Sequence, residues 1–418
     1  MDCTNIIKKL LGKGQYTFYN SLIEKVTFFV LFVYLARDLN KGLYGNVILV
    51  FTFSSIIYSL FEFGLNSYFQ REVKSSGDKS GRKIDQAIYI RLVSFVFYLL
   101  INFAYIVPKI NISLFSFLLI IISIFIINTN SLFSSIFNGL SKYILPFKSI
   151  FISRTIFVVL FSIAVFLKSS LEILITALLI SSICQSYINL KFLNANKISL
   201  FRNLFDLELT KTILKSSLPM GIGVLFVWLY NKADIIFIQH LIGYREVAIY
   251  AVSYSVYQLS AFFPGIVLTP LFTELSLDYS KNNSISFKSV YSSVFLLFGI
   301  SVLICAIIYL TGDKIIVMVY GPEYSISSRI LVLLIIAIPG LYLNNVTGVI
   351  LNSIKKERLA MISAFFAFAI NSIINIIYLP KIGIMAAVIS TIITEYFIFI
   401  MQLVLILLVN KKDGKLFY

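Results

Sequence analysis

The stretch Trp228-Leu-Tyr-Asn-Lys-Ala-Asp-Ile-Ile-Phe-Ile238 is an apolar run that contains a lysine and an aspartate. Together with the apolar residues before it, the run is long enough to cross a membrane as a helix. Lys232 and Asp234 are two residues apart, so on a helix they point to different sides and do not neutralise each other. A charge at the centre of such a helix costs about 2.5–3.5 kcal/mol, so each needs a partner or a wet cavity.

The apolar character of this stretch extends over the whole chain. Of its 418 residues, 59% are hydrophobic and only 13% are charged, whereas a soluble domain carries about 25% charged residues. The sequence therefore predicts an all-α polytopic membrane protein, because the strict two-residue alternation of a membrane β-barrel is absent. The three cysteines, Cys3, Cys184 and Cys305, are far apart and suggest neither a disulfide framework nor a metal site.

Reading apolar runs between charged or turn-rich breaks predicts twelve spans, at 16–36, 43–63, 86–107, 112–133, 149–167, 173–192, 217–238, 248–270, 290–311, 330–350, 359–379 and 385–409. Of the 35 Lys and Arg residues, 23 fall at the two termini and in or at the edge of the loops after even-numbered spans, and eight fall in the loops after odd-numbered spans. Positive residues collect on the cytoplasmic side, so this bias predicts that both termini are cytoplasmic. It also explains the net charge of +16 without a nucleic-acid partner.

Weak internal similarity divides the chain into two halves. Leu43-Tyr-Gly45 opens the second predicted span, and Ile249-Tyr-Ala251 opens the eighth. We therefore expect an N-terminal six-helix lobe at 1–205 and a C-terminal six-helix lobe at 206–418. Two lobes of like orientation would form a parallel repeat, an arrangement in which the binding site lies near the bilayer midplane between the repeats. This predicts a central cavity.

Seven charged residues within the spans are the candidate functional residues. Lys25 and Lys232, with help from Arg91 and Arg154, would line a cationic cavity that suits an anionic ligand such as phosphate. Two alternatives stay open: internal ion pairs that hold helices together, and, for the two arginines, side chains that extend to the lipid headgroups. The remaining candidates are carboxylates that would couple to H⁺ or Na⁺, at Glu24, Asp234 and Glu395.

Other polar or helix-breaking residues inside the spans give a weaker signal. Pro264-Gly265 and Pro339-Gly340 are expected to break the helical hydrogen-bond ladder in spans eight and ten. Asn371 and Asn375, and the pair Asn344-Asn345, would contact either sugar hydroxyls or neighbouring helices. We found no Gly-x-x-x-x-Gly-Lys-Ser/Thr loop and no metal-ligand spacing, and the outward loops are short. These features argue against an enzyme and predict no cofactor and no metal.

Three groups of short motifs carry a family resemblance: Tyr34-Leu-Ala-Arg-Asp-Leu-Asn-Lys-Gly-Leu-Tyr-Gly45 with Phe61-Glu-Phe-Gly-Leu65; Lys232-Ala-Asp-Ile-Ile-Phe-Ile-Gln-His-Leu-Ile-Gly243; and Val319-Tyr-Gly-Pro-Glu-Tyr324 with Leu351-Asn-Ser-Ile-Lys-Lys356. In their order and spacing the chain resembles the O-antigen-type oligosaccharide flippases of the multidrug/oligosaccharidyl-lipid/polysaccharide (MOP) transporter superfamily. The resemblance implies a MATE-like fold of twelve helices in two lobes and a cationic lumen, for which Lys25, Arg91, Arg154 and Lys232 are the matching residues.

The resemblance also implies a function in polysaccharide biosynthesis, such as that of O-antigen and lipopolysaccharide. The expected cargo is a polyprenyl-pyrophosphate-linked oligosaccharide, turned from the cytoplasmic to the outer leaflet of the inner (plasma) membrane. Membrane lipids, H⁺ or Na⁺, and other glycan-assembly membrane proteins are the expected partners. The main alternative is a cation-coupled drug or metabolite antiporter of the same superfamily, in which the carboxylates would be primary. An enzyme of glycan assembly and a structural membrane protein are further alternatives.

Overall fold

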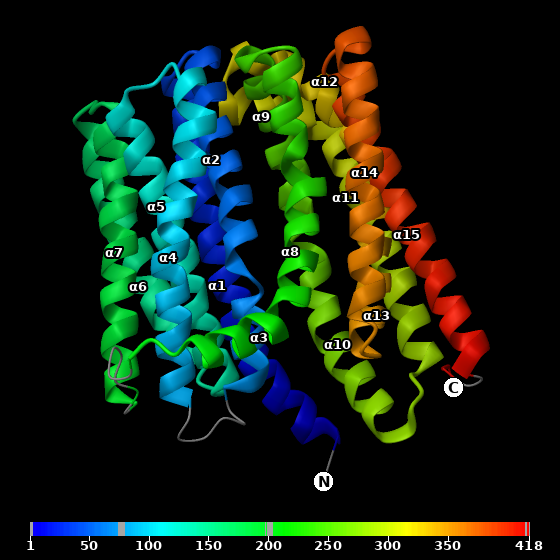
Figure 1. The fold of residues 1–418 in the computed structure, drawn as a ribbon. Coiled ribbons are helices and arrows are strands. Elements are labelled where there is room, and N and C mark those ends of the chain that lie inside the picture. Colours follow the sequence, from blue (N-terminus) through cyan, green and yellow to red (C-terminus); the bar gives the residue numbers. More distant parts are fainter. Residues whose placement is uncertain (1–2, 74–79, 197, 199–203, 414–415, 418) are drawn as a thin grey trace. The chain divides into compact units, whose positions relative to one another are not determined.

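The computed structural model describes residues 3–73, 80–196, 198, 204–413 and 416–417 (Figure 1). In this part of the chain, helices and short connections account for the structure, apart from one isolated bridge between Ile285 and Phe417. The elements are α1 (Cys3–Asp38), α2 (Lys41–Glu62), α3 (Leu65–Glu72), α4 (Ser80–Ile106), η2 (Val107–Lys109), α5 (Leu114–Gly139), α6 (Ile144–Phe166), α7 (Leu171–Ala195), α8 (Leu207–Leu241), α9 (Tyr244–Ser260), α10 (Phe263–Asn282), α11 (Phe287–Tyr320), η3 (Pro322–Tyr324), α12 (Ser325–Leu334), α13 (Ala337–Ser353), α14 (Glu357–Ile382) and α15 (Met385–Asp413).

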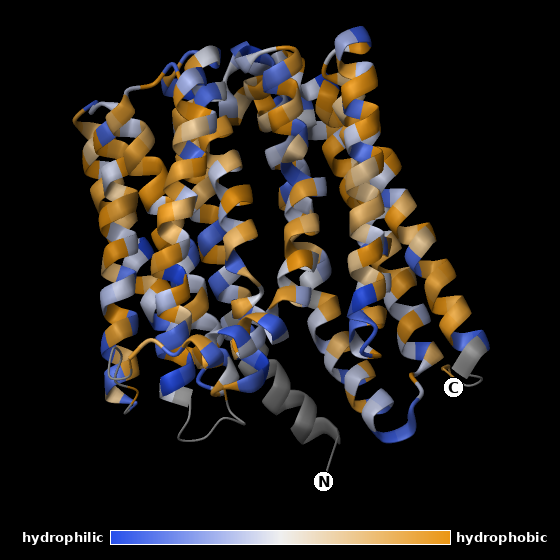
Figure 2. Cartoon of the chain, viewed as in Figure 1, coloured by the Kyte–Doolittle hydropathy of each residue, from blue (hydrophilic) through white to orange (hydrophobic). Residues whose placement is uncertain are grey.

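Ten of the described helices are long and apolar enough to cross a membrane, and the number rises to twelve if each of two bent helix pairs forms one span. Orange, the colour of hydrophobic residues, dominates along the helices in Figure 2. Large apolar side chains on the outside are typical of a lipid-facing surface, and Phe166 is 86% exposed while Leu310 is 75% exposed. The prediction of an all-α polytopic membrane protein is confirmed.

The two bent pairs are Tyr244–Gly265 with Val267–Asn282, at 41°, and Pro322–Leu334 with Ala337–Ser353, at 51°. They coincide with predicted spans eight and ten, where Pro-Gly pairs were expected to interrupt the helices. Pro264 is the second residue of α10, and Pro339 is the third residue of α13. A proline is tolerated in the first turn, since its missing N–H has no partner there in any case. Pro339 therefore lies in the first turn of the second half of its bent pair, and Pro264 lies immediately before the break in the other pair.

The chain forms two compact units. The amino unit comprises Gln15–Leu31 and Leu49–Leu225, and the carboxyl unit comprises Met1–Gly14, Phe32–Ile48 and Phe226–Tyr418. Helices α1, α2 and α8 each contribute residues to both units, so neither unit is one continuous segment of the chain. The predicted lobe boundary between 205 and 206, and the predicted central cavity, stay predictions.

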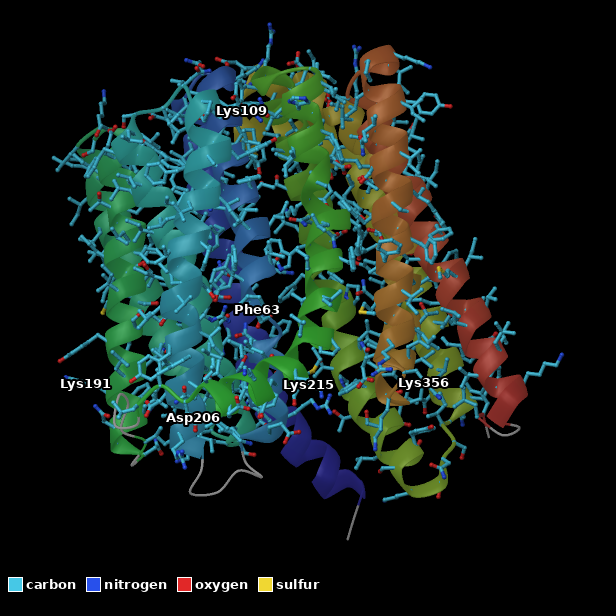
Figure 3. All side chains as sticks on the ribbon, in the orientation of Figure 1. Phe63, Lys109, Lys191, Asp206, Lys215 and Lys356 are labelled. Atoms are coloured by element: carbon cyan, nitrogen blue, oxygen red, sulfur yellow. The ribbon has the colours of Figure 1, made fainter. Side chains whose placement is uncertain are left out.

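In the amino unit, α5 contacts α3, α4, α6 and α7, and α6 also packs along α7. The short helix α3 turns Leu65, Tyr68 and Phe69 into a buried cluster with side chains of α4 and α5. In Figure 3, Lys109 lies at one end of this unit, and Asp206 and Lys215 lie at the other. The sequence placed these positions on opposite sides of the membrane, 109 outward and the other two cytoplasmic, and which side is cytoplasmic stays a prediction.

The amino unit contains a close backbone approach between the turn after α2 and helix α8. Gly64 has φ +74°, and a Cβ there would lie 2.2 Å from the carbonyl oxygen of Ser217. At Gly221 an added Cβ would lie 2.5 Å from both the amide nitrogen of Gly64 and the carbonyl carbon of Phe63. Backbone atoms cannot move aside as a flexible side chain can, so the two glycines are needed for this contact.

Replacing Gly221 by alanine is therefore expected to destabilise the protein by about 1–3 kcal/mol, the usual cost of overpacking. The measurement is the thermal unfolding of the purified protein in detergent. Gly299→Ala in α11 is the matched control, because an added Cβ there meets no atom within 4 Å. An unchanged melting temperature for Gly221→Ala would contradict the packing described here.

In the carboxyl unit, α15 packs along both α13 and α14, and α13 also contacts α10 and α11. Helix α9 packs against α12 and α11. Two glycines help to end these helices: Gly321 follows α11 with φ +101°, and Gly383 follows α14 with φ +63°. This packing encloses the polar side chains of α8, α9, α13, α14 and α15 that form the main candidate site.

Candidate functional site

Asp234 of α8 lies in a buried cage of hydrogen-bond donors in the carboxyl unit. The carboxylate oxygen Oδ1 accepts hydrogen bonds from the amides of Asn371 (2.9 Å) and Asn375 (2.7 Å). The other oxygen, Oδ2, accepts from the hydroxyls of Tyr250 (2.8 Å) and Thr391 (3.2 Å). Asp234 is only 2% exposed. Four donors around one side chain are the pattern expected for an ionised carboxylate, which only accepts.

The spacing of residues on three helices builds this cage. Asn371 and Asn375 are four residues apart on α14, so they share one face of the helix. Ser390, next to Thr391 on α15, accepts from both amides at 3.2 and 3.1 Å. The asparagines therefore make interhelical hydrogen bonds, the second of the two roles expected for them. Among the described residues no Lys, Arg or His nitrogen lies within 4.0 Å of the Asp234 carboxylate, so hydrogen bonds alone offset the cost of its burial.

Glu395 is a second buried carboxylate in the same unit, one helical turn after Thr391 on α15. It is 2% exposed. Its Oε1 accepts a hydrogen bond from the hydroxyl of Tyr257 at 2.9 Å, and its Oε2 accepts from the amide of Asn344. No ion pair of Glu395 occurs within the described ranges. With one donor on each oxygen, Glu395 is less completely hydrogen-bonded than Asp234.

Lys232 precedes Asp234 by two residues on α8, and among the described residues it forms no ion pair with Asp234 or Glu395. Its ammonium donates to Oε1 of Gln258 at 2.8 Å and lies 5.0 Å from the centre of the Tyr254 ring. Both partners are neutral residues of α9. The sequence-based expectation that Lys232 and Asp234 do not neutralise each other agrees with this geometry. An amide and an aromatic face hold an ammonium less tightly than a carboxylate does.

Glu24 and Arg154 meet in the amino unit, where α1 packs along α6. Oε1 of Glu24 lies 3.9 Å from a terminal nitrogen of Arg154, which is an ionic contact too long for a hydrogen bond. The Arg154 side chain is 2% exposed, and its Nε and both terminal nitrogens lack a hydrogen-bond acceptor. Buried N–H donors without an acceptor are costly, so an anion that binds to the Arg154 guanidinium would satisfy them.

Aromatic contacts fix the register of these two helices. The rings of Tyr16 and Tyr19 on α1 lie 5.5 and 6.2 Å from the ring of Phe147 on α6. The ionic contact then follows five to eight residues later on α1 and seven residues later on α6, so the two helices run parallel. Parallel direction agrees with their prediction as spans one and five. Lys25, the next residue after Glu24, is exposed.

Arg91 has a different environment from the other three cations. Its guanidinium donates to the carbonyl oxygen of Phe61 at 3.1 Å and lies 3.8 Å from Oε1 of Glu62. Glu62 in turn accepts from the backbone N–H groups of Gly64 (2.9 Å) and Asn66 (2.7 Å), at the start of α3. Arg91 is 2% exposed, so the guanidinium is enclosed in the protein rather than placed among lipid headgroups. It stabilises the turn between α2 and α3.

The sequence-predicted residues thus fall into separate groups. Asp234, Lys232 and Glu395 gather around α9 in the carboxyl unit, while Glu24, Lys25, Arg91 and Arg154 belong to the amino unit. The predicted site set did not include several neutral partners or the buried Glu62. The tyrosines Tyr250, Tyr254 and Tyr257 could have been found from their spacing on one helix face, and Glu62 from its place two residues before Gly64. Gln258 and Thr391 have no comparable signal in the sequence.

Comparison with known proteins places the chain among transporters. The family model described as polysaccharide biosynthesis protein matches residues 11–276, and the model MatE matches residues 219–377. No curated protein matches the sequence.

Similar solved structures include an inward-facing multidrug resistance MATE family transporter of the MOP superfamily, which has 15% identity and a TM-score of 0.72 over 92% of this chain and 95% of that one. A MOP superfamily transporter from Pyrococcus furiosus has 13% identity and a TM-score of 0.71 over 95% and 94%. A eukaryotic MATE transporter has 13% identity and a TM-score of 0.71 over 96% of each chain.

At these identities the structures establish the fold, and the family models establish the class of protein. The chain is a multi-pass membrane protein with the fold of the MATE family transporters. Since the first model covers more than half of its length, the chain belongs to the polysaccharide biosynthesis protein family.

Proposed function

We propose that the protein is a flippase for a polyprenyl-pyrophosphate-linked oligosaccharide, moved from the cytoplasmic to the outer leaflet by alternating access. The observation that carries the proposal is the state of Arg154. Its guanidinium is buried, and none of its three nitrogens has a hydrogen-bond acceptor. A planar guanidinium binds phosphate oxygens in a bidentate way, so a pyrophosphate would satisfy the donors that the protein leaves unpaired.

The two lysines are the other proposed contacts of the cargo. Lys232 in the carboxyl unit donates to an amide oxygen and faces a ring, both neutral, so a phosphate would offer its ammonium a stronger, charge-assisted contact. In the amino unit, Arg154 supplies the directional contacts, and Lys25, whose side chain is exposed, is a further proposed contact. Arg91 already has Glu62 and a carbonyl oxygen as partners, so its part is to stabilise the α2–α3 turn.

Asp234 and Glu395 are the proposed sites of ion coupling, with Glu24 as a third candidate. A buried carboxylate without a cationic partner favours binding of a proton or of Na⁺, and either ion would change the charge of the carboxyl unit during the cycle.

A second candidate function is export of amphipathic cations by a coupled antiporter. The two buried carboxylates favour it, and the similar MATE transporter is described as a multidrug resistance protein. The description of the Pyrococcus furiosus transporter states that reverse polarity of its binding pocket suggests a different function. Proteins of this fold therefore differ in the charge of their pockets, and the cations of this chain favour the anionic cargo.

Deletion of the gene tests the proposal in the host. We expect loss of surface glycan together with accumulation of the lipid-linked precursor on the cytoplasmic side of the plasma membrane. Accumulation of precursor is decisive, because a defect in glycan synthesis would lower the surface glycan without it. A deletion strain with normal surface glycan but increased sensitivity to cationic drugs would favour the antiporter.

Lys25→Ala and Lys232→Ala are expected to restore little or no surface glycan to the deletion strain, although both proteins should reach the membrane in normal amounts. The physical reason is the loss of a charge-assisted contact of about 1.5–3 kcal/mol with the cargo. Lys168→Ala, at the outward end of α6, is the control and should complement fully. Near-normal glycan with both variants would refute the assignment of these lysines.

A further inference from the structure

Three tyrosines of α9 form a continuous aromatic stack between the two buried carboxylates. Tyr250 and Tyr254 are stacked with ring centres 5.4 Å apart and planes at 24°, and the Tyr257 ring follows at the same distance from Tyr254, tilted by 47°. At the two ends of the stack, the Tyr250 hydroxyl donates to Asp234 and the Tyr257 hydroxyl donates to Glu395. The spacing of four and three residues puts all three rings on one face of the helix.

Tyr254 is the central member of the stack and the residue that Lys232 contacts. Its hydroxyl donates to the carbonyl oxygen of Asn231 at 2.6 Å, which fixes the ring against α8. The ammonium of Lys232 lies 5.0 Å from the ring centre. All three tyrosines are nearly fully buried, with exposed fractions from 1% to 4%. The Tyr254 ring thus contacts Lys232, the proposed cargo contact, and also the two tyrosines that donate to Asp234 and Glu395.

We propose that Tyr254 is the coupling residue of this transporter, transmitting the occupancy of Lys232 by a phosphate group to the ion-binding carboxylates Asp234 and Glu395. The inference rests on the proposed function, because it takes the pyrophosphate as the ligand of Lys232. Tyr254 touches neither the ion nor the cargo in this scheme. It acts as a positioning residue.

The energies of the contacts make such coupling feasible. A cation–π contact contributes about 0.5–2 kcal/mol, whereas a phosphate offers an ammonium stronger, charge-assisted bonds. Binding of pyrophosphate therefore draws Lys232 away from the ring. Tyr254 then loses a neighbour on one side, its stacking with Tyr250 relaxes, and the hydrogen bond from Tyr250 to Asp234 weakens. Coupling of this kind is reciprocal, so an ion on Asp234 must change the affinity for the phosphate.

The test measures both ends of the stack in the full-length protein. Trp228 is the only tryptophan of the chain and lies one helical turn before Lys232, so its fluorescence reports binding of inorganic pyrophosphate. A hydrophobic carbodiimide, with mass spectrometry of the labelled peptides, reports how reactive Asp234 and Glu395 are. In the wild-type protein, saturating pyrophosphate should accelerate labelling of Asp234 by roughly fivefold or more.

Tyr254→Leu removes the ring, and the acceleration should disappear while the pyrophosphate affinity changes by no more than about threefold, the value of one weak cation–π contact. Tyr254→Phe keeps the ring and loses only the bond to Asn231, so it should retain the acceleration. This variant also serves if the leucine variant does not fold. Lys232→Met should label Asp234 rapidly even without pyrophosphate, because its ring contact is already absent.

Two results overturn the role of Tyr254: equal acceleration in Tyr254→Leu and wild type, or binding of pyrophosphate to wild type without any change in labelling. Loss of the acceleration in Tyr254→Phe would assign the coupling to the hydroxyl and contradict the stacking route. If wild-type protein shows no pyrophosphate binding by fluorescence or calorimetry, the cargo contact of the proposed function fails, and the coupling role fails with it.

Discussion

Replacement of Asp234 by asparagine is expected to reduce transport to background while leaving the protein folded and in the membrane. The substitution keeps the shape of the side chain, and the surrounding hydroxyls and amides can reorient toward its amide group. It removes the negative charge that binds the coupling ion. The measurements are the surface glycan of the complemented deletion strain and the thermal unfolding of the purified variant.

Asp234→Ala separates the structural from the functional part of this effect. It removes the shared acceptor of the cage, at about 1–3 kcal/mol for each buried donor that stays unpaired, although Thr391 keeps the carbonyl oxygen of Ala387 and both amides keep Ser390 as acceptors. We therefore expect a much lower melting temperature for the alanine variant than for the asparagine variant, with transport lost in both. Normal transport by Asp234→Asn would contradict the ion-coupling role of this residue, and equal melting temperatures would contradict the cage.

Arg154→Gln is expected to weaken the binding of pyrophosphate by roughly 10- to 100-fold, the value of hydrogen bonds to a charged group. Arg154→Lys should recover only part of the affinity, because an ammonium cannot make the bidentate contact of a guanidinium. The measurements are calorimetric titration of the purified protein with inorganic pyrophosphate, and accumulation of lipid-linked precursor in cells.

Glu24→Gln is the control that distinguishes an anion site from a structural ion pair. If Arg154 only pairs with Glu24 to hold α1 against α6, both variants should damage folding equally and binding only through folding. If Arg154 binds the cargo, Glu24→Gln should leave the pyrophosphate affinity unchanged or increased, since a competing carboxylate charge is gone. Unchanged affinity in Arg154→Gln would contradict the cargo site.

The sequence predicted the fold class because membrane helices follow from a simple physical requirement. Long apolar runs must satisfy their backbone groups internally, and the alternating Lys and Arg content of the loops separates the runs into spans. Predicted spans eight and ten illustrate the limit of this approach. Each is a single apolar run, but in the structure both are bent pairs, with Pro264 just before one break and Pro339 just after the other.

The candidate site was predicted from its charged residues and its asparagines, since an apolar run makes such residues conspicuous. Asp234, Glu395 and Lys232 were found in this way, and the asparagines were expected to contact either sugars or neighbouring helices. The tyrosine and threonine partners were not found, because these are ordinary residues of a membrane helix, and only the fold brings α9, α14 and α15 to one carboxylate. For Arg91, one of the alternatives considered from the sequence is not seen in the structure. Its position near the end of a span suggested that its side chain extends to the lipid headgroups, but Glu62 from another helix pairs with it in the interior.

Reconstitution into vesicles tests the central claim most directly. Purified protein is incorporated into liposomes that contain a polyprenyl-pyrophosphate-linked oligosaccharide with a labelled glycan, and an impermeant glycan-modifying enzyme reports the leaflet of the label over time. We predict rapid, protein-dependent transfer that Lys232→Ala and Arg154→Gln abolish, and no uptake of amphipathic cations by the same vesicles. Cation transport driven by an ion gradient, without movement of the lipid-linked glycan, would contradict the proposed function.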